Sequence, residues 1–112
     1  MLLPDAEKIT KIYEYCCEIE KTIARYGASF TVFDEDADFQ RSISFSLLQI
    51  GEISNGLSEE FRKETEKEIP WHAIRGMRNM VAHSYGAMSR EVIWDTAINS
   101  IQTLKIFCEK YI

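Results

Sequence analysis

The amino-acid sequence predicts an all-α fold, an antiparallel four-helix bundle with a short extra helical connector. Four stretches repeat apolar residues every three or four positions, which is the spacing of a helix that buries one face. No stretch alternates apolar and polar residues as a half-buried strand does. The connections between the four stretches are short, which favours antiparallel neighbours. With 112 residues, five Gly and two Pro, the chain is expected to form one domain over residues 1–112.

The first helix is expected to begin near Pro4 and Asp5 and to end at Gly27, since a glycine commonly follows the last helical residue. Its predicted buried face consists of Ile9, Ile12, Tyr13, Cys16, Ile19, Ile23 and Tyr26. The next segment, ASFTVF at 28–33, is expected to be a loop with some strand propensity.

The second helix follows the acidic run DEDAD at 34–38, because carboxylates favour a helix N-terminus. Its predicted buried face contains Phe39, Ile43, Leu47, Ile50 and Ile53, and Asn55-Gly56 is expected to end it. Ser58, followed by two glutamates, predicts a cap for a short helical piece that continues into KETEKE. We expect this piece to be a solvated connector, with docking of a protein partner as the alternative.

The third helix is expected to start at Pro70, which a first turn tolerates, and to run to about Ser84, before Gly86. The fourth helix is expected to be capped by Ser89 and to run to the C-terminus. Its apolar positions are Val92, Ile93, Ala97, Ile101, Leu104, Phe107, Cys108 and Tyr111.

Charge is distributed unevenly along the chain. The net charge of −5 argues against general nucleic-acid binding, which depends on lysine and arginine. Pro70 to Arg90, however, contains three arginines and no Asp or Glu, so this segment carries +3 and the rest, with 10 basic and 18 acidic residues, carries −8. The third helix and the turn after it therefore form a positive island.

Neither a membrane span nor a metal or disulfide framework is expected. The longest apolar runs contain a few residues, and the N-terminus MLLPDAEK lacks the pattern of a signal peptide, so we expect a cytoplasmic protein. The three cysteines are an odd number and lack the spacing of metal ligands.

The third helix gathers polar side chains on one face. At about 100° per residue and with Arg78 at zero, Tyr85 falls at about −20°, Arg75 at about 60°, Asn79 at about 100° and His83 at about 140°. Trp71 and Ala82 fall inside the same arc, so we expect this face to be partly covered.

Arg78 and His83 diverge too far to converge easily on one small ligand from a single chain. A twofold dimer would bring the arginine of one subunit near the histidine of the other, which predicts a composite site in a dimer cleft.

These groups suit the cleavage of RNA by its own 2′-hydroxyl. Arginine offers a planar donor fork for a phosphate and for the charge of the phosphoryl transition state. Histidine takes or gives a proton near neutral pH, and asparagine holds an oxygen or orients the histidine. We therefore expect His83 to act as acid or base and Arg78 to bind the phosphate, with no metal or cofactor required.

The segment RNMVAHSY, Arg78 to Tyr85, resembles the signature of HEPN domains. Together with IPWHAIRGMRN before it, EVIW after it and LLQIGEISNGL in the second helix, the whole chain resembles the HepT-like toxins of MNT–HEPN toxin–antitoxin modules. This resemblance implies a dimeric helical bundle, a metal-independent endoribonuclease and a nucleotidyltransferase antitoxin as partner. It also implies a prokaryotic cytoplasm.

By the same resemblance, Arg78, Asn79 and His83 match the active-site positions of the family. Tyr85 matches the tyrosine to which the antitoxin can attach AMP. Arg75 and Arg90 are interpreted first as solvated or salt-bridged residues, with a weak phosphate contact as the alternative for Arg75.

Two questions stay open at the level of the sequence. Gly51-Glu52 is either a close helix crossing beside an exposed acid, or Glu52 pairs with an arginine near the site. The alternative to a ribonuclease is a non-catalytic HEPN binding module that partners a nucleotidyltransferase.

Overall fold

The computed structural model describes residues 3–84 and 90–112, and all regular structure in those ranges is helical. The helices are α1 Leu3–Tyr26, α2 Phe30–Glu35, α3 Ala37–Asn55, α4 Glu59–Thr65, α5 Trp71–Ser84, α6 Arg90–Asp95, a π-helical segment Thr96–Ser100 and α7 Ile101–Glu109. The predicted all-α class is confirmed.

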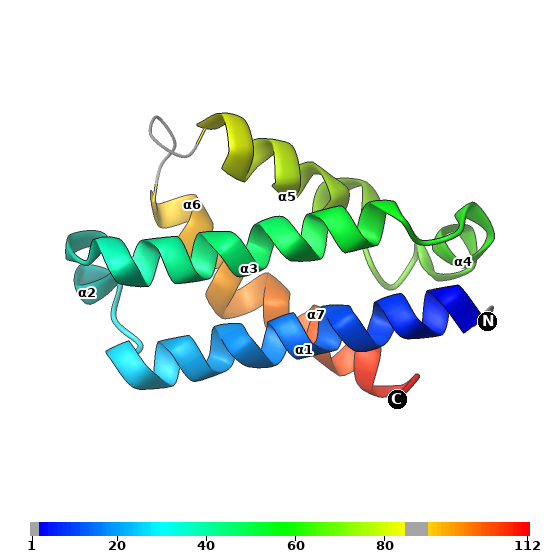
Figure 1. The fold of residues 1–112 in the computed structure, drawn as a ribbon, viewed down its shortest axis with the longest axis horizontal. Coiled ribbons are helices and arrows are strands. Elements are labelled where there is room, and N and C mark those ends of the chain that lie inside the picture. Colours follow the sequence, from blue (N-terminus) through cyan, green and yellow to red (C-terminus); the bar gives the residue numbers. More distant parts are fainter. Residues whose placement is uncertain (1–2, 85–89) are drawn as a thin grey trace.

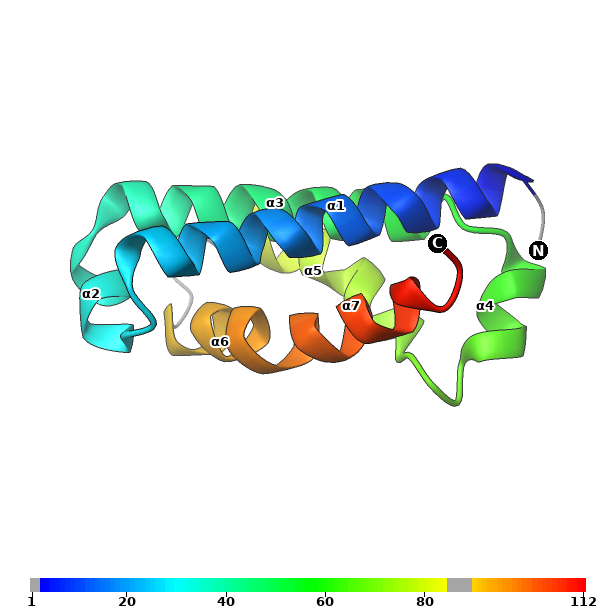
Figure 2. The same cartoon turned by 90° about the horizontal axis from the view of Figure 1, so that it is seen from below.

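The four long elements of the bundle are α1, α3, α5 and the C-terminal helix from α6 to α7. α1 and α3 run side by side in opposite directions, and α5 crosses α3 obliquely (Figure 1). α7 packs against α1, and Figure 2 shows the C-terminal helix running beneath the layer that α1 and α3 form. The short helix α2 joins one end of α1 to α3, while α4 joins α3 to α5 (Figure 1).

The core is built from the apolar faces that the sequence predicts. The fully buried side chains of α1 and α3 are Ile9, Ile12, Cys16, Ile19, Phe39, Ile43, Leu47 and Ile50. Burying each large apolar side chain contributes about 1.5–3 kcal/mol, so these two faces supply much of the driving force for folding. Because the helices are apolar on one side only, no helix in the described ranges could cross a membrane.

Three predicted helix boundaries are confirmed by their hydrogen bonds. Gly27 adopts the left-handed conformation, with φ of 106°, and its N–H donates to the carbonyl of Ile23 at 2.7 Å, which ends α1. Asp36 caps α3, and the hydroxyl of Ser58 caps α4 by accepting from the N–H of Phe61 at 3.1 Å.

The segment 28–33 differs from its predicted loop, because residues 30–35 form α2. Ser29 caps this helix, and Phe33 is fully buried. The ring of Phe33 packs at 5.2 Å from that of Phe39 and at 5.1 Å from that of Trp94. A segment with strand propensity needs a neighbouring strand to pair with, and the described residues contain none. The burial of the Phe33 ring and the Ser29 cap therefore favour a helix here.

α4 is more than the predicted solvated connector. Phe61 and Thr65 are buried, and the indole N–H of Trp71 donates to the hydroxyl of Thr65 at 2.8 Å. Trp71 is therefore a core residue, 3% exposed, which agrees with the expected partial cover of the face on which it falls. Angular position along α5 could not reveal that α4 folds back over the start of that helix.

The sequence predicted a regular helix from Ser89 to the C-terminus. The C-terminal helix differs from that prediction in one turn. A π-helical turn spans Thr96–Ser100, and the N–H of Ile101 donates to the carbonyl of Thr96. Ile93, Ala97 and Ile101 are all buried at spacings of four residues, which would drift around a regular helix. The wider π turn keeps these positions on one face.

Two of the three cysteines serve as small apolar core residues. Cys16 and Cys108 are buried and free. Burial raises the pKa of the Cys16 thiol and raises the pKa of the Cys108 thiol to about 12, so both stay uncharged at neutral pH.

α3 and α5 approach each other most closely at Gly51. A Cβ atom at Gly51 would lie 2.8 Å from the backbone nitrogen of Arg78 and 3.2 Å from the carbonyl oxygen of Ile74. Only a residue without a side chain lets the two backbones meet at this distance. The crossing places Arg78 directly against α3.

Gly51→Ala is expected to lower the free energy of unfolding by about 1–3 kcal/mol, because the added methyl must push α5 away from α3. Gly76→Ala is the matched control. A Cβ at Gly76 meets nothing within 4 Å. That substitution should raise the free energy of unfolding by about 0.5–1 kcal/mol through helix propensity alone. Urea unfolding followed by circular dichroism measures both, and equal stabilisation by the two alanines would contradict the close crossing.

Candidate functional site

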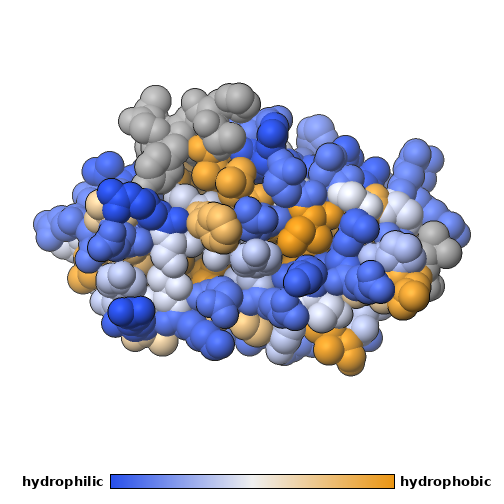
Figure 3. Space-filling model, in the orientation of Figure 1, coloured by the Kyte–Doolittle hydropathy of each residue, from blue (hydrophilic) through white to orange (hydrophobic). Residues whose placement is uncertain are grey.

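A polar hollow of about 330 Å³ lies where α3 and α5 cross. It is lined by Gly51, Glu52 and Asn55 from α3 and by Arg75, Arg78 and Asn79 from α5. The structure thus brings together three of the predicted site residues and adds three from α3. The surrounding face is mainly hydrophilic, with smaller apolar patches between the polar side chains (Figure 3).

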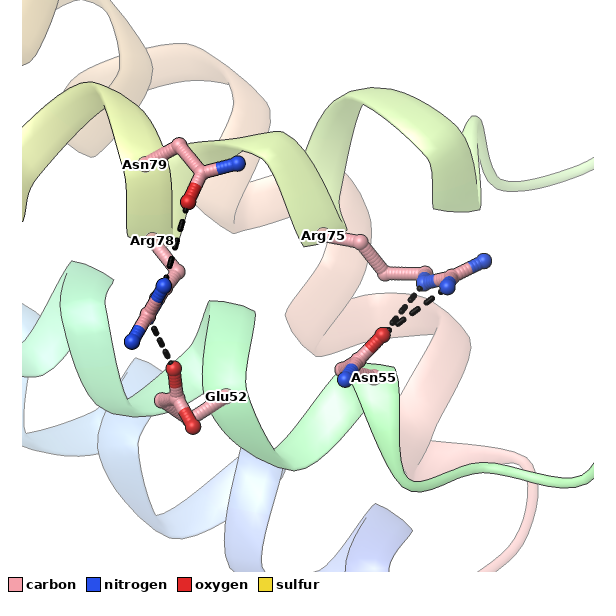
Figure 4. A network of polar contacts seen from close by, with 5 residues as sticks. All are labelled: Glu52, Asn55, Arg75, Arg78 and Asn79. Atoms are coloured by element: carbon pink, nitrogen blue, oxygen red, sulfur yellow. Dashed lines mark hydrogen bonds and ion pairs between the residues drawn. The ribbon is translucent and has the colours of Figure 1, made fainter.

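Arg78 lines this hollow and is held by two neighbours (Figure 4). Its Nε forms an ion pair with the carboxylate of Glu52, and its Nη1 donates to Oδ1 of Asn79 at 3.2 Å. The side chains of Arg78 and Glu52 are each 50% exposed. Both interpretations of Gly51-Glu52 therefore apply, since the glycine makes the crossing and the acid pairs with the arginine.

Asn79 contacts the arginine through its amide oxygen. This oxygen accepts from Arg78, so the amide NH₂ is directed away from that bond (Figure 4). Within the described part of the chain the NH₂ has no partner, and it can donate to an oxygen of a ligand. Asn79 can therefore orient the guanidinium and bind a ligand at once.

Arg75 lies one turn from Arg78, at the other side of the hollow. Its Nε and Nη2 both donate to Oδ1 of Asn55, at 3.0 and 2.8 Å (Figure 4). Arg75 is thus fixed by a neutral amide and keeps its charge uncompensated by an acid. Arg90, in contrast, pairs with Asp34 at 2.7 Å, as the salt-bridged interpretation predicts.

Asn55 is a site residue that the sequence did not reveal. Its position before Gly56 identified it only as the end of a helix. Its side chain holds Arg75, and its backbone carbonyl accepts from Arg62 at 3.4 Å. No local pattern signals these contacts, because they depend on how α4 and α5 return to the end of α3.

Two predicted site residues are not placed. The side chain of His83, in the last turn of α5, and the whole of Tyr85 lie outside the part of the chain that the structure describes. Their assigned roles stay predictions.

The arrangement favours an oxyanion ligand. Two guanidinium groups and one carboxylate line the hollow, which leaves a net charge of +1 in a chain of net charge −5. The fork of Arg78 and the amide of Asn79 are donors suited to phosphate oxygens. Among the described side chains no group of three or more His, Cys, Asp or Glu is placed to hold a metal ion.

Comparisons with known proteins place the chain among ribonucleases. The family model described as Ribonuclease HepT-like matches residues 8–111. A protein of Caldanaerobacter subterraneus subsp. tengcongensis, named as a candidate RNase, is 34% identical over 91% of this chain and 86% of its own. The Probable ribonuclease HepT of Thermococcus cleftensis is 32% identical over 94% of this chain and 86% of its own. No solved structure matches the chain.

Glu52→Gln is expected to strengthen the binding of inorganic phosphate at Arg78, because it removes the negative charge that competes for the guanidinium. The free energy of unfolding should change by less than about 1 kcal/mol, since the ion pair is half exposed. Titration of the Arg78 Nε–H signal by NMR measures the affinity. Glu18→Gln, which breaks an exposed pair with Lys21, is the control. Equal phosphate affinity in both variants would show that Glu52 does not compete with the ligand.

Proposed function

The chain belongs to the HepT-like ribonuclease family, and we propose that it is a metal-independent endoribonuclease whose site is shared by two subunits. Arg78, Asn79 and His83 are the proposed catalytic residues. The observation that carries the proposal is the polar hollow at the α3–α5 crossing, where the exposed fork of Arg78 is held between Glu52 and Asn79.

In the proposed reaction, the 2′-oxygen of a ribose attacks the adjacent phosphorus and the bond from phosphorus to the 5′-oxygen breaks. One proton leaves the 2′-hydroxyl and another joins the departing 5′-oxygen, so the products are a 2′,3′-cyclic phosphate and a 5′-hydroxyl. His83 serves as the acid or the base. Arg78 stabilises the charge on the non-bridging oxygens, and the NH₂ of Asn79 holds one of them.

A twofold dimer completes the proposed site. His83 lies five positions after Arg78, which turns the two side chains apart by about 140° on a regular helix. In an isologous dimer each arginine would meet the histidine of the partner.

A non-catalytic binding module is the second candidate. The net charge of −5 and the carboxylate of Glu52 inside the hollow both disfavour a long RNA strand. In that case Arg78 and Asn79 would hold a nucleotide or the dimer contact, and the chain would serve a nucleotidyltransferase as its partner. The two candidates differ in whether purified protein cleaves RNA.

Arg78→Ala and His83→Ala should each abolish RNA cleavage, while circular dichroism and the melting temperature stay nearly unchanged. Cleavage by the wild type should persist in EDTA and leave 2′,3′-cyclic phosphate ends, which mass spectrometry of the products detects. Loss of activity on chelation would contradict the metal-independent mechanism. A pure wild-type protein that cleaves no RNA would favour the binding module.

Mixing the two inactive variants tests the shared site. A mixed dimer contains one site with both substitutions and one with neither. If half of the dimers are mixed, activity should return to roughly a quarter of the wild-type level. Sites built within single chains would stay inactive in the mixture.

Control of the enzyme is proposed to act through Tyr85. In this proposal the chain is the toxin of a toxin–antitoxin module in a prokaryotic cytoplasm, and a nucleotidyltransferase antitoxin attaches AMP to the phenol oxygen. The support is the match of Tyr85 to the modified tyrosine of the family, seven residues after Arg78. The added phosphodiester brings a negative charge that competes with RNA for Arg78, and the adenosine occupies space in the groove.

Tyr85→Phe removes the acceptor oxygen and keeps the ring, so this variant should remain toxic when the cognate nucleotidyltransferase is co-expressed. Mass spectrometry of the co-expressed wild type should show added AMP that is absent from Tyr85→Phe. AMP that persists unchanged in the variant would identify a different acceptor.

A further inference from the structure

We propose that a second hollow, between α4 and the start of α5, binds the phosphate backbone of the RNA strand that runs through the site. This basic hollow has a volume of about 610 Å³ and contains Arg62, Lys63 and Lys67. Arg75 lines both this hollow and the site hollow, so the two adjoin at this side chain. The inference rests on the proposed function, because RNA is the ligand that would occupy both.

The balance of charge in the basic hollow favours an anion. Four cationic side chains line it, from Arg62, Lys63, Lys67 and Arg75, against the two carboxylates of Glu59 and Glu66. The carboxylate of Glu59 lies 3.3 Å from Nζ of Lys63, so that acid already compensates one cation. His72, which is exposed, adds a ring N–H donor to the lining.

Lys67 is the cation most available to a ligand. No acid or acceptor within the described part of the chain pairs with it. Lys63 and Glu59, by comparison, form an exposed pair whose side chains are 72% and 75% exposed. A phosphate can therefore approach Lys67 without displacing a partner, whereas at Lys63 it must compete with a carboxylate.

Asn55 fixes the arginines that connect the two hollows. Its Oδ1 accepts from Arg75, and its backbone carbonyl accepts from Arg62, whose Nη1 also donates to the carbonyl of Leu57. The two guanidinium groups are thus positioned around the end of α3 before any ligand binds. The cationic side chains form a series from Arg78 through Arg75 to Arg62 and Lys67. An RNA strand carries one phosphate per nucleotide, so a strand that runs along this series could contact a cation at successive phosphates.

The acidic remainder of the chain limits where a polyanion can lie. Outside residues 70–90 the chain carries −8, so most of its surface repels RNA. A hollow with an excess of cations next to the site is the path on which a strand meets the least repulsion. An acidic protein surface could use the same cations, and the experiment separates that occupant from RNA.

The test measures the binding of 2′-O-methyl oligonucleotides, which cannot be cleaved because the attacking oxygen is blocked. Lys67→Gln should weaken binding of a long oligonucleotide about two- to fivefold, the range expected for one exposed ion pair. It should also reduce the slope of log affinity against log salt by about 0.7. Lys67→Glu should weaken binding further, while binding of a dinucleotide, which fills only the site hollow, should stay unchanged.

Lys21→Gln is the matched control, because it removes the same charge from an exposed lysine in the last two turns of α1. That end of α1 lies at the opposite side of the molecule from α4 (Figure 1). The control should bind both oligonucleotides as the wild type does.

Equal affinity of the wild type and both Lys67 variants for the long oligonucleotide would overturn the proposal and leave the hollow to an acidic protein surface. A wild type that binds neither oligonucleotide would overturn it as well. Failure of this proposal can be distinguished from failure of the proposed ribonuclease function. If binding depends on oligonucleotide length and on Lys67 but unmodified RNA is not cleaved, RNA binding in the basic hollow is retained and the ribonuclease proposal is refuted. If RNA of every length is cleaved equally by the wild type and the Lys67 variants, the ribonuclease proposal is retained and RNA binding in the basic hollow is refuted.

Discussion

The backbone contact between α3 and α5 at Gly51 is the constraint on which the site depends. Because the amide nitrogen of Arg78 would lie 2.8 Å from a Cβ at position 51, the two helices meet without a side chain between them. This contact puts Glu52 within reach of Arg78 and Asn55 within reach of Arg75. A bundle with the usual spacing of 8–10 Å between helix axes, set by side chains at the crossing, would separate these pairs.

The same crossing explains how an acidic chain presents a basic surface. The segment from Pro70 through α5 contains arginines and no acids, while α3 supplies one carboxylate and one amide to the hollow. Asn55, being neutral, fixes Arg75 without cancelling its charge. Glu52 cancels part of the charge of Arg78, so the positive potential is concentrated between the two arginines and continues toward α4.

The sequence predicted the parts of the fold that depend on periodicity and caps. The buried faces of α1 and α3, the glycine that ends α1 and the serine that caps α4 follow from local chemistry. The helical state of residues 30–35, the burial of Trp71 and the π turn at Thr96–Ser100 depend on tertiary contacts, which no local pattern contains.

The predicted site divides in the same way. Helical geometry placed Arg75, Arg78 and Asn79 on one face, and these three do line one hollow. The contribution of α3 was recognised only as an open question at Glu52 and was missed at Asn55. Both contacts join residues more than 15 positions apart, so a single sequence offers no signal that pairs them.

Strong and weak interactions have separate effects at this site. Buried apolar side chains and the glycine contact fix the backbone position of Arg78. A change there lowers the free energy of unfolding by about 1–5 kcal/mol. The ion pair and the hydrogen bond that direct its guanidinium are half exposed, and each contributes at most about 1 kcal/mol. A phosphate can therefore replace Glu52 as the partner of Arg78 without disturbing the fold. A buried ion pair would resist that exchange, because breaking it leaves a charge without a partner in a medium of low polarity.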